Sequence, residues 1–204
     1  MAAPHDGHLG AVYAARDTAQ VAAAYDAWAE TYEAEMRAAG YRHPSIGLAL
    51  LSRHLPRGAG PVLDAGAGTG LNGEWLAILG YPEAEALDLS AGMLAVAARK
   101  RVYSRLTLAA MGGPLPYADG AFAAIVSTGV FTTGHVGAEA LPELFRICRP
   151  GGVIVLTVKQ TVWDAGIDGW LGANGIERIE TTAPYVSMPG EAATTPSLAV
   201  VLRA

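Results

Sequence analysis

Apolar residues in the larger, C-terminal part of the chain fall into short runs that alternate with helical stretches. Seven runs have the length and residue content of β-strands, and they cover residues 62–64, 84–88, 105–109, 123–127, 153–158, 176–182 and 198–202. Helical stretches are expected over residues 70–79, 90–101, 137–147 and 164–173. This alternation is typical of βαβ units, so the pattern predicts a three-layer αβα sandwich around a mostly parallel sheet.

The connection between the last two predicted strands differs from the others. Residues 183–197 are rich in Pro and Thr and leave no room for a clear helix. A parallel pair of strands needs a long crossover, whereas an antiparallel pair can be joined directly. We therefore expect the last of seven strands to run antiparallel to its neighbour.

The N-terminal part follows another pattern. Residues 1–16 show no period and are expected to form a loose arm. A helix is predicted over residues 18–38, because apolar and aromatic residues recur there at steps of three and four, namely Val21, Tyr25, Trp28, Tyr32 and Met36. Pro44 opens a shorter helix that ends before Pro56. The chain thus divides into an arm and helical lid (1–56) and one compact domain (57–204).

Composition narrows the classes of function. The chain of 204 residues is 51% hydrophobic and 16% charged, which favours a globular protein with a sizeable core. Its net charge is −5 and its basic residues are scattered, so no nucleic-acid partner is expected. No apolar run approaches the roughly 18 residues of a membrane helix, so no membrane partner is expected either. The single cysteine, Cys148, is expected to be a core residue, and it fits a reducing, cytoplasmic location.

Candidate chemistry begins at the end of the first predicted strand. Asp64 precedes three alternating glycines, Gly66, Gly68 and Gly70, where the strand gives way to a helix. Glycines there let the backbone approach a ligand closely, and a helix N-terminus favours a negative group. A dinucleotide fingerprint would need a small residue where the bulky Leu71 stands. A phosphate-binding loop would need a Lys that is absent, so both nucleotide motifs are disfavoured.

An acid ends the second predicted strand. Asp88 follows Gly70 by 18 residues, the place from which a carboxylate accepts hydrogen bonds from a ribose diol. The alternative is that Asp88 only caps the helix that starts near Ser90.

The acidic residue before G-x-G-x-G, together with Asp88, resembles motif I of the class I S-adenosylmethionine-dependent methyltransferases. Residues 113–117, 119–126 and 144–152 look like later landmarks of that superfamily, and the resemblance covers roughly residues 60–158. Residues 25–32, 134–136 and 188–190 are similar to the Williams–Beuren-region methyltransferase-like family. The resemblance implies the class I methyltransferase, Rossmann-like fold, with S-adenosyl-L-methionine as cofactor and S-adenosyl-L-homocysteine as its product.

The same resemblance implies a set of cofactor-binding residues drawn from the lid, the glycine turn and the ends of the next strands: Tyr25, Tyr32, Asp64, Gly66, Gly68, Gly70, Asp88, Leu89, Met93, Met111, Gly112 and Gly129. Many superfamily members place an Asp after the third strand to bind adenine. Here residues 110–113 read Ala-Met-Gly-Gly, so apolar packing by Met111 and Leu89 is expected instead. Core packing is the alternative role for the aromatic residues Tyr25 and Tyr32.

Methyl transfer by in-line displacement to a small-molecule acceptor is the activity that this reading predicts. His135, in the loop after the fourth strand, is the candidate general base, with a structural hydrogen bond to the backbone as its alternative role. No metal site is expected, since His5 and His8 supply too few ligands. A nucleotide-dependent oxidoreductase and a non-catalytic cofactor-binding module are the alternatives. The identity of the acceptor and the oligomeric state stay open.

Overall fold

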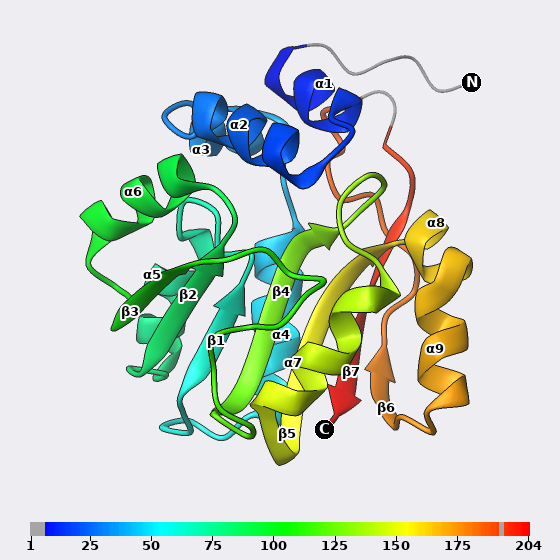
Figure 1. Ribbon diagram of the computed structural model, residues 1–204. Coiled ribbons are helices and arrows are strands. Elements are labelled where there is room, and N and C mark those ends of the chain that lie inside the picture. Colours follow the sequence, from blue (N-terminus) through cyan, green and yellow to red (C-terminus); the bar gives the residue numbers. More distant parts are fainter. Residues whose placement is uncertain (1–6, 192–193) are drawn as a thin grey trace.

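Helices and strands alternate through most of the chain, as the computed structural model shows for residues 7–191 and 194–204 (Figure 1). The helices are α1 (Gly7–Ala14), α2 (Thr18–Trp28), α3 (Tyr32–Ala38), α4 (His43–His54), α5 (Leu71–Leu79), α6 (Ala91–Lys100), α7 (Leu141–Ile147), α8 (Gln160–Val162) and α9 (Asp168–Ala173). A π-helical turn, Trp163–Ile167, joins α8 to α9. The four helical stretches expected beyond residue 62 are confirmed, with small shifts of their ends.

All seven predicted strands are present in one sheet. They are β1 (Val62–Ala65), β2 (Ala84–Asp88), β3 (Arg105–Leu108), β4 (Phe122–Phe131), β5 (Cys148–Lys159), β6 (Arg178–Thr181) and β7 (Ser197–Arg203). Their order is β3-β2-β1-β4-β5-β7-β6. Only β7 is antiparallel to its neighbours, β5 and β6, among these strands. The mostly parallel sheet with an antiparallel last strand is therefore confirmed, although β4 continues beyond its predicted end at residue 127.

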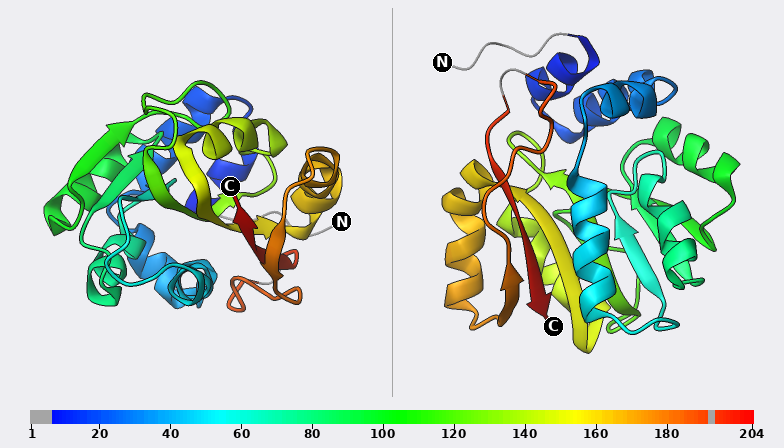
Figure 2. Two further views of the ribbon diagram at one scale, coloured as in Figure 1. Left: turned by 90° about the horizontal axis from the view of Figure 1, so that it is seen from below. Right: turned by 180° about the vertical axis from the view of Figure 1, so that it is seen from behind.

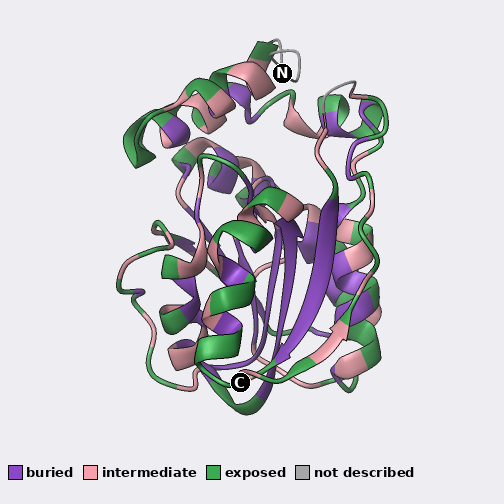
Figure 3. Cartoon of the chain, turned by 90° about the vertical axis from the view of Figure 1, so that its right-hand side faces the viewer, coloured by how far each residue is buried: buried purple, intermediate pink, exposed green. Residues whose placement is uncertain are grey.

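Helices cover both faces of the sheet and complete the three layers. On one face α4 and α5 bury Leu51 and Leu76 against the strands. On the other face α7 and α9 bury Leu144 and Leu171. Figure 3 shows buried strands between helices whose outer sides are exposed. Cys148 is buried in the second of these clusters, as expected for a core residue, and burial raises the pKa of its thiol to about 11.

Helices α1, α2 and α3 lie above the carboxyl ends of the parallel strands, and we call residues 7–38 the cover (Figure 1). A separate apolar cluster joins Val12, Trp28 and Met36 of the cover to Met93 of α6 and Met188. The expectation of a loose arm is therefore wrong for Gly7–Ala14. Its helix lacks a clear apolar period in sequence and is held by the tertiary contact of Val12. Residues 1–6 of that arm, including His5, lie outside the described residues.

The predicted helix over residues 18–38 is broken between α2 and α3. The Trp28 indole N–H donates to Glu35 Oε2 at 2.9 Å, and the Thr31 hydroxyl donates to Glu35 Oε1 at 2.6 Å. These two bonds fix the angle between the helices. No Gly or Pro marks the break, so the period alone could not reveal it.

Two other segments meet the cover. Helix α4, which the sequence pattern groups with the lid at residues 1–56, packs against β4 and β5 as part of the sandwich. The connection between β6 and β7 rises to the cover, as Figure 2 shows from behind, and the Gly190 N–H donates to the Ala39 carbonyl at 3.0 Å. Within the described residues no helix is long and apolar enough to cross a membrane.

Candidate active site

The glycine turn follows β1 directly. Gly66, Gly68 and Gly70 all have positive φ, at 80°, 54° and 82°. A Cβ on Gly66 would lie 2.2 Å from Val130 Cγ2, so the close approach of β4 excludes any side chain there. A Cβ on Gly68 would meet nothing within 4 Å, which leaves the backbone of the turn open to a ligand.

Asp88 ties this turn to the end of β2. Its Oδ2 accepts the Gly68 N–H at 2.8 Å, and its Oδ1 accepts the Ser90 N–H at 2.9 Å. Burial raises the pKa of the Asp88 carboxyl, although the amides of Ser90, Gly68 and Leu89 oppose this effect. Asp88 thus supports the start of α6 and also stands at the glycine turn, so the two roles weighed for it are compatible.

A small cavity of about 60 Å³ brings most of the predicted residues together beneath the cover. The predicted residues that line it are Tyr25, Tyr32, Gly66, Gly68, Asp88, Leu89, Met93, Met111, Gly129 and His135. Its other lining residues were not predicted: Leu87, Ala109, Thr128 and Val130. These four lie at the carboxyl ends of β2, β3 and β4 or directly after them, and the parallel register of those strands is the signal that could have found them.

Three predicted residues do not line this cavity. Asp64 is fully buried, and its carboxylate accepts hydrogen bonds from Asn72 Nδ2 at 2.9 Å and the Tyr103 hydroxyl at 2.5 Å. Burial raises its pKa to about 6. A Cβ on Gly70 would contact Tyr103 and Ala97, so this glycine serves packing.

A Cβ on Gly112, the third of these residues, would lie 3.5 Å from Glu139 Cγ and 3.8 Å from Val136 Cγ2. These positions support the walls of the site and do not face its interior.

The cover closes the cavity through α2. The Tyr25 hydroxyl lies 3.1 Å from His135 Nε2, and burial raises the pKa of Tyr25 well above its usual value. Asp26 Oδ1 accepts hydrogen bonds from the Ser90 hydroxyl at 2.5 Å and the Gly92 N–H at 2.7 Å, which anchors α2 to the start of α6. The cover therefore contacts both the start of α6, beside Asp88, and the loop after β4.

His135 is held in a defined orientation. Its Nδ1 lies 3.3 Å from the Thr133 carbonyl oxygen, which can only accept a hydrogen bond. Nδ1 then carries the proton of the neutral ring, and Nε2 accepts from the Tyr25 hydroxyl. Burial lowers the pKa of His135, and the nearby charge of Lys159 lowers it further, so the neutral, proton-accepting form prevails at pH 7.

A second pocket of about 250 Å³ adjoins the first on the side of β3. It shares Leu89, Met111, Val130 and His135 with the cavity, and its outer wall is the start of α2. The two spaces together approach the roughly 300 Å³ at the lower end of small-molecule sites.

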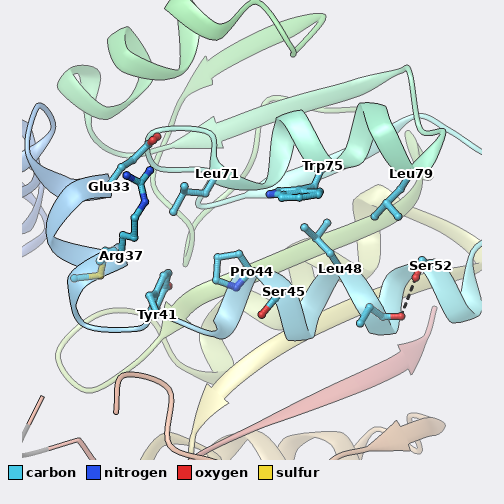
Figure 4. A pocket seen from close by; sticks show the side chains of 12 residues that line it. Glu33, Arg37, Tyr41, Pro44, Ser45, Leu48, Ser52, Leu71, Trp75 and Leu79 are labelled. Carbon is cyan, nitrogen blue, oxygen red and sulfur yellow. Dashed lines mark hydrogen bonds between the residues drawn. The ribbon is translucent and has the colours of Figure 1, made fainter. Parts of the chain in front are cut away.

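A larger groove of about 580 Å³ lies elsewhere, between α3, α4 and α5 (Figure 4). Figure 4 shows Leu71, Trp75 and Leu79 along α5 on one side of it and Leu48 of α4 on the other. This groove holds no residue of the glycine turn and neither Asp88 nor His135. Choosing the candidate site by pocket volume alone would therefore select this groove and miss the cavity at the glycine turn.

Comparisons with known proteins point to one family. The Methyltransferase domain family matches residues 63–156. The chain is similar to Methyltransferase-like protein 27 of Homo sapiens, with 36% identity over 149 residues that cover 70% of this chain and 59% of that protein. It is also similar to Malonyl-[acyl-carrier protein] O-methyltransferase of Pseudescherichia vulneris, with 32% identity over 175 residues that cover 82% of this chain and 67% of that protein.

A solved structure supports the fold. The TehB-like SAM-dependent methyltransferase from Corynebacterium glutamicum has a TM-score of 0.66 at 21% identity, over 89% of this chain and 98% of that chain. The chain spans less than two thirds of Methyltransferase-like protein 27, so that relative contains sequence with no counterpart in this match.

Proposed function

Because the chain belongs to the family of S-adenosylmethionine-dependent methyltransferases, its cofactor is S-adenosyl-L-methionine, and we propose that it methylates a small-molecule acceptor. Membership of this family argues against the alternative that the chain is a nucleotide-dependent oxidoreductase. The proposal concerns the acceptor, the residues that hold the cofactor and the manner of transfer.

Asp88 and the glycine turn would hold the cofactor's ribose and its neighbouring atoms. The Asp88 oxygens each have lone-pair capacity beyond the amides that they already accept, so the ribose hydroxyls could donate to them. The open space at Gly68 admits a ligand against the backbone. Leu89 and Met111, which line both the cavity and the pocket of about 250 Å³, would pack against adenine.

The aromatic rings of Tyr25 and Tyr32 would cover the cationic end of the cofactor. Both line the cavity opposite the glycine turn. A cation over an aromatic ring gains about 0.5–2 kcal/mol, depending on how far it is desolvated. These rings would therefore favour the cofactor, with its sulfonium charge, over its product, whose thioether sulfur is neutral.

His135 would take the proton of a hydroxyl acceptor. S-adenosyl-L-methionine supplies a methyl group on a sulfonium, so the acceptor oxygen gains the methyl carbon as the carbon–sulfur bond breaks. Nε2 of His135 faces the cavity in the proton-accepting form. An acceptor hydroxyl could replace that of Tyr25 at this nitrogen. The remaining work of the protein is alignment and exclusion of water.

The cover would have to move for the cofactor to enter. The cavity of about 60 Å³ is far smaller than a typical small-molecule site of roughly 300–1,000 Å³. Hydrogen bonds link the cover to the loop after β4, among them one between Tyr25 and His135 and one between the hydroxyls of Tyr13 and Thr132. Breaking these links and lifting the cover would open the site, and closing it would exclude water during transfer.

The observation that carries the proposal is the meeting of the glycine turn, Asp88 and His135 in one cavity under the cover. Calorimetric titration with S-adenosylmethionine, S-adenosylhomocysteine and NAD⁺ tests it. We expect both sulfur compounds to bind at one site and NAD⁺ not to bind. Absence of binding by the sulfur compounds would refute the proposal.

A methyl-acceptor screen with labelled cofactor separates an enzyme from a non-catalytic binding module. We expect label transfer to one chemical class of small molecules. Cofactor binding with no label transfer to either small molecules or peptides would favour a non-catalytic binding module. The cytoplasmic location expected from the sequence stays a prediction, and fractionation of the producing cell would test it.

A further inference from the structure

A third space of about 40 Å³ lies beneath the cover, beyond the cavity of the glycine turn. The two share Tyr25, Tyr32, Gly129 and His135, so they adjoin at the candidate base. This third space, which we call the distal cavity, contains no residue of the glycine turn and does not include Asp88. It lies on the acceptor side of the proposed methyl transfer.

The walls of the distal cavity are mainly aromatic and apolar. Rings of Tyr13, Trp28 and Tyr41 line it, together with Met36 and Met188. No Asp or Glu lines it among residues 7–191 and 194–204. A molecule that fills this space would therefore need an apolar body.

One full charge stands in this apolar surrounding. Lys159, the last residue of β5, is 6% exposed and lines the distal cavity. Its Nζ lies 4.6 Å from the centre of the Tyr13 ring. Across the described part of the chain, no carboxylate forms an ion pair with it and no acceptor takes a hydrogen bond from it. The Tyr13 ring is thus its one recorded interaction within the described residues, and a negative group on the remaining side of the ammonium would complete its surroundings.

The electrostatic field of this lysine reaches both histidines of the cavity wall. Its charge contributes to lowering the pKa of His43 and of His135, after burial in each case. Neither ring therefore supplies a second positive charge at neutral pH. The cavity presents a single cation.

A second polar group in the wall also has no partner. Ser187, in the connection between β6 and β7, is fully buried, and its hydroxyl has no hydrogen-bond partner in the described structure. It lines the same cavity as Lys159. The Lys159 ammonium at the end of β5 and the Ser187 hydroxyl in the β6–β7 connection therefore both line the distal cavity without a hydrogen-bond acceptor among the described residues.

We propose that Lys159 and Ser187 form an anion subsite, and that the methyl acceptor is a small carboxylic acid with an apolar body. The inference rests on the proposed methyl transfer, because it assigns the distal cavity to the acceptor. One ammonium and one hydroxyl match a carboxylate, whereas phosphate sites favour the bidentate fork of arginine, which this cavity lacks. The carboxylate anchors at Lys159, and the atom to be methylated lies toward His135 and Gly129.

Titration with benzoate and its uncharged analogue benzamide tests the subsite. The protein is loaded with S-adenosylhomocysteine, and binding is followed by calorimetry at low salt. We expect benzoate to bind at least about tenfold more tightly than benzamide, the loss expected for a charged hydrogen bond. Equal affinities for the two compounds in the unmodified protein would overturn the proposal.

Two charge variants on the same strand provide a matched comparison. Lys159→Met should abolish the preference for benzoate, whereas Arg149→Met, at the exposed opposite end of β5, should keep it. Ser187→Ala should weaken benzoate binding a few fold. An unchanged preference in Lys159→Met, or an equal loss in Arg149→Met, would contradict the subsite. If Lys159→Met does not fold, the ratio of benzoate to benzamide affinity in the unmodified protein and the effect of Ser187→Ala on benzoate binding test the subsite.

Two further titrations exclude other ligands. Inorganic phosphate binding more tightly than benzoate would overturn the carboxylate assignment. Weaker S-adenosylmethionine binding by Lys159→Met, with the benzoate preference retained, would mean that Lys159 holds the cofactor's own carboxylate. The benzoate titration is repeated without S-adenosylhomocysteine, so that the anion subsite is tested independently of cofactor binding. Failure to bind S-adenosylhomocysteine would refute only the methyltransferase function.

Discussion

The cofactor side and the acceptor side of the space under the cover are built in different ways. On the cofactor side, residues 66–70 follow β1 and residues 87–89 form the end of the adjacent strand β2, and hydrogen bonds such as Gly68 N–H to Asp88 link them directly. On the acceptor side, Tyr13, His43, Lys159 and Ser187 come from four distant parts of the chain. The first side depends on strand register, and the second depends on how the cover and the β6–β7 connection pack.

This difference teaches where specificity can vary. A site fixed by strand register tolerates little change, because moving one residue displaces the whole turn. A wall assembled from a cover, a loop and a connection can change its chemistry one residue at a time without disturbing the sheet. The predictions below compare the two sides, beginning with the largest expected effect.

Gly68→Val should abolish cofactor binding. The added side chain would fill open space that the ligand needs: no atom of the described structure lies within 4 Å of its Cβ, although the φ of 54° strains a β-branched residue. The matched control is Gly175→Val, because Gly175 has a similar φ of 64°, also has open space at Cβ, and lies between α9 and β6. Calorimetry should show no binding for the first variant and normal binding for the second. Normal binding by both would mean that the glycine turn does not contact the cofactor.

His135→Ala should lower kcat by about 10²- to 10⁴-fold for a hydroxyl acceptor, the usual share of a positioned general base. Affinity for the cofactor should change little. Because the pKa of His135 is lowered, the rate should fall only as the pH drops below the ordinary histidine value near 6.5.

The measurement is the pH dependence of kcat in both proteins, once the screen has found an acceptor. Tyr25→Phe is the control for loss of the hydrogen bond to His135, and it should keep the pH dependence. Unaltered turnover and acceptor affinity in His135→Ala would leave this residue with only its loop-stabilising bond to Thr133.

Asp88→Ala should weaken binding of S-adenosylmethionine by about 1–3 kcal/mol, the range for losing a charged acceptor. Asp64→Asn is a useful contrast, because Asp64 lies outside the cavity and supports Asn72 and Tyr103. That variant should lose thermal stability more than affinity. If the folded Asp88→Ala protein binds the cofactor as tightly as the unmodified chain, the ribose assignment is wrong.

The same contrast explains what the sequence could predict. The seven strands, the glycine turn and Asp88 were predictable, because each depends on a local pattern or on the end of a strand. The break after Trp28 depends on the bonds to Glu35, and α1 depends on the burial of Val12, so neither left a local signal. The sequence gives no signal for Lys159 as a functional candidate, since only the tertiary packing of the cover places it in an aromatic wall without an ion pair to any described residue.

His43 should make the acceptor side sensitive to acid, an effect that is absent at neutral pH. Burial, aided by the charge of Lys159, lowers its pKa from 6.5 to about 3. The unfolded chain therefore takes up this proton first, so the contribution to stability is complete above pH 6.5 and is lost as the pH falls toward 3.

On the cofactor side the sign is opposite, because burial raises the pKa of Asp64 to about 6. The folded protein binds that proton first, so its effect on stability becomes more favourable as the pH falls from 6 toward the ordinary value of 3.8. The two sides should thus respond in opposite directions, and the net pH dependence of the unmodified protein reports only their sum.

Denaturant unfolding of His43→Gln at several pH values separates the two contributions. Glutamine can keep a hydrogen bond to Tyr185, which lies 2.8 Å from His43 Nδ1, but it does not titrate. The unmodified protein should lose up to about 1.4 kcal/mol relative to the variant for each pH unit below 6.5. Parallel curves for the two proteins would show that His43 protonates equally in both states, and the acceptor side would then be open to water and not sealed by the cover.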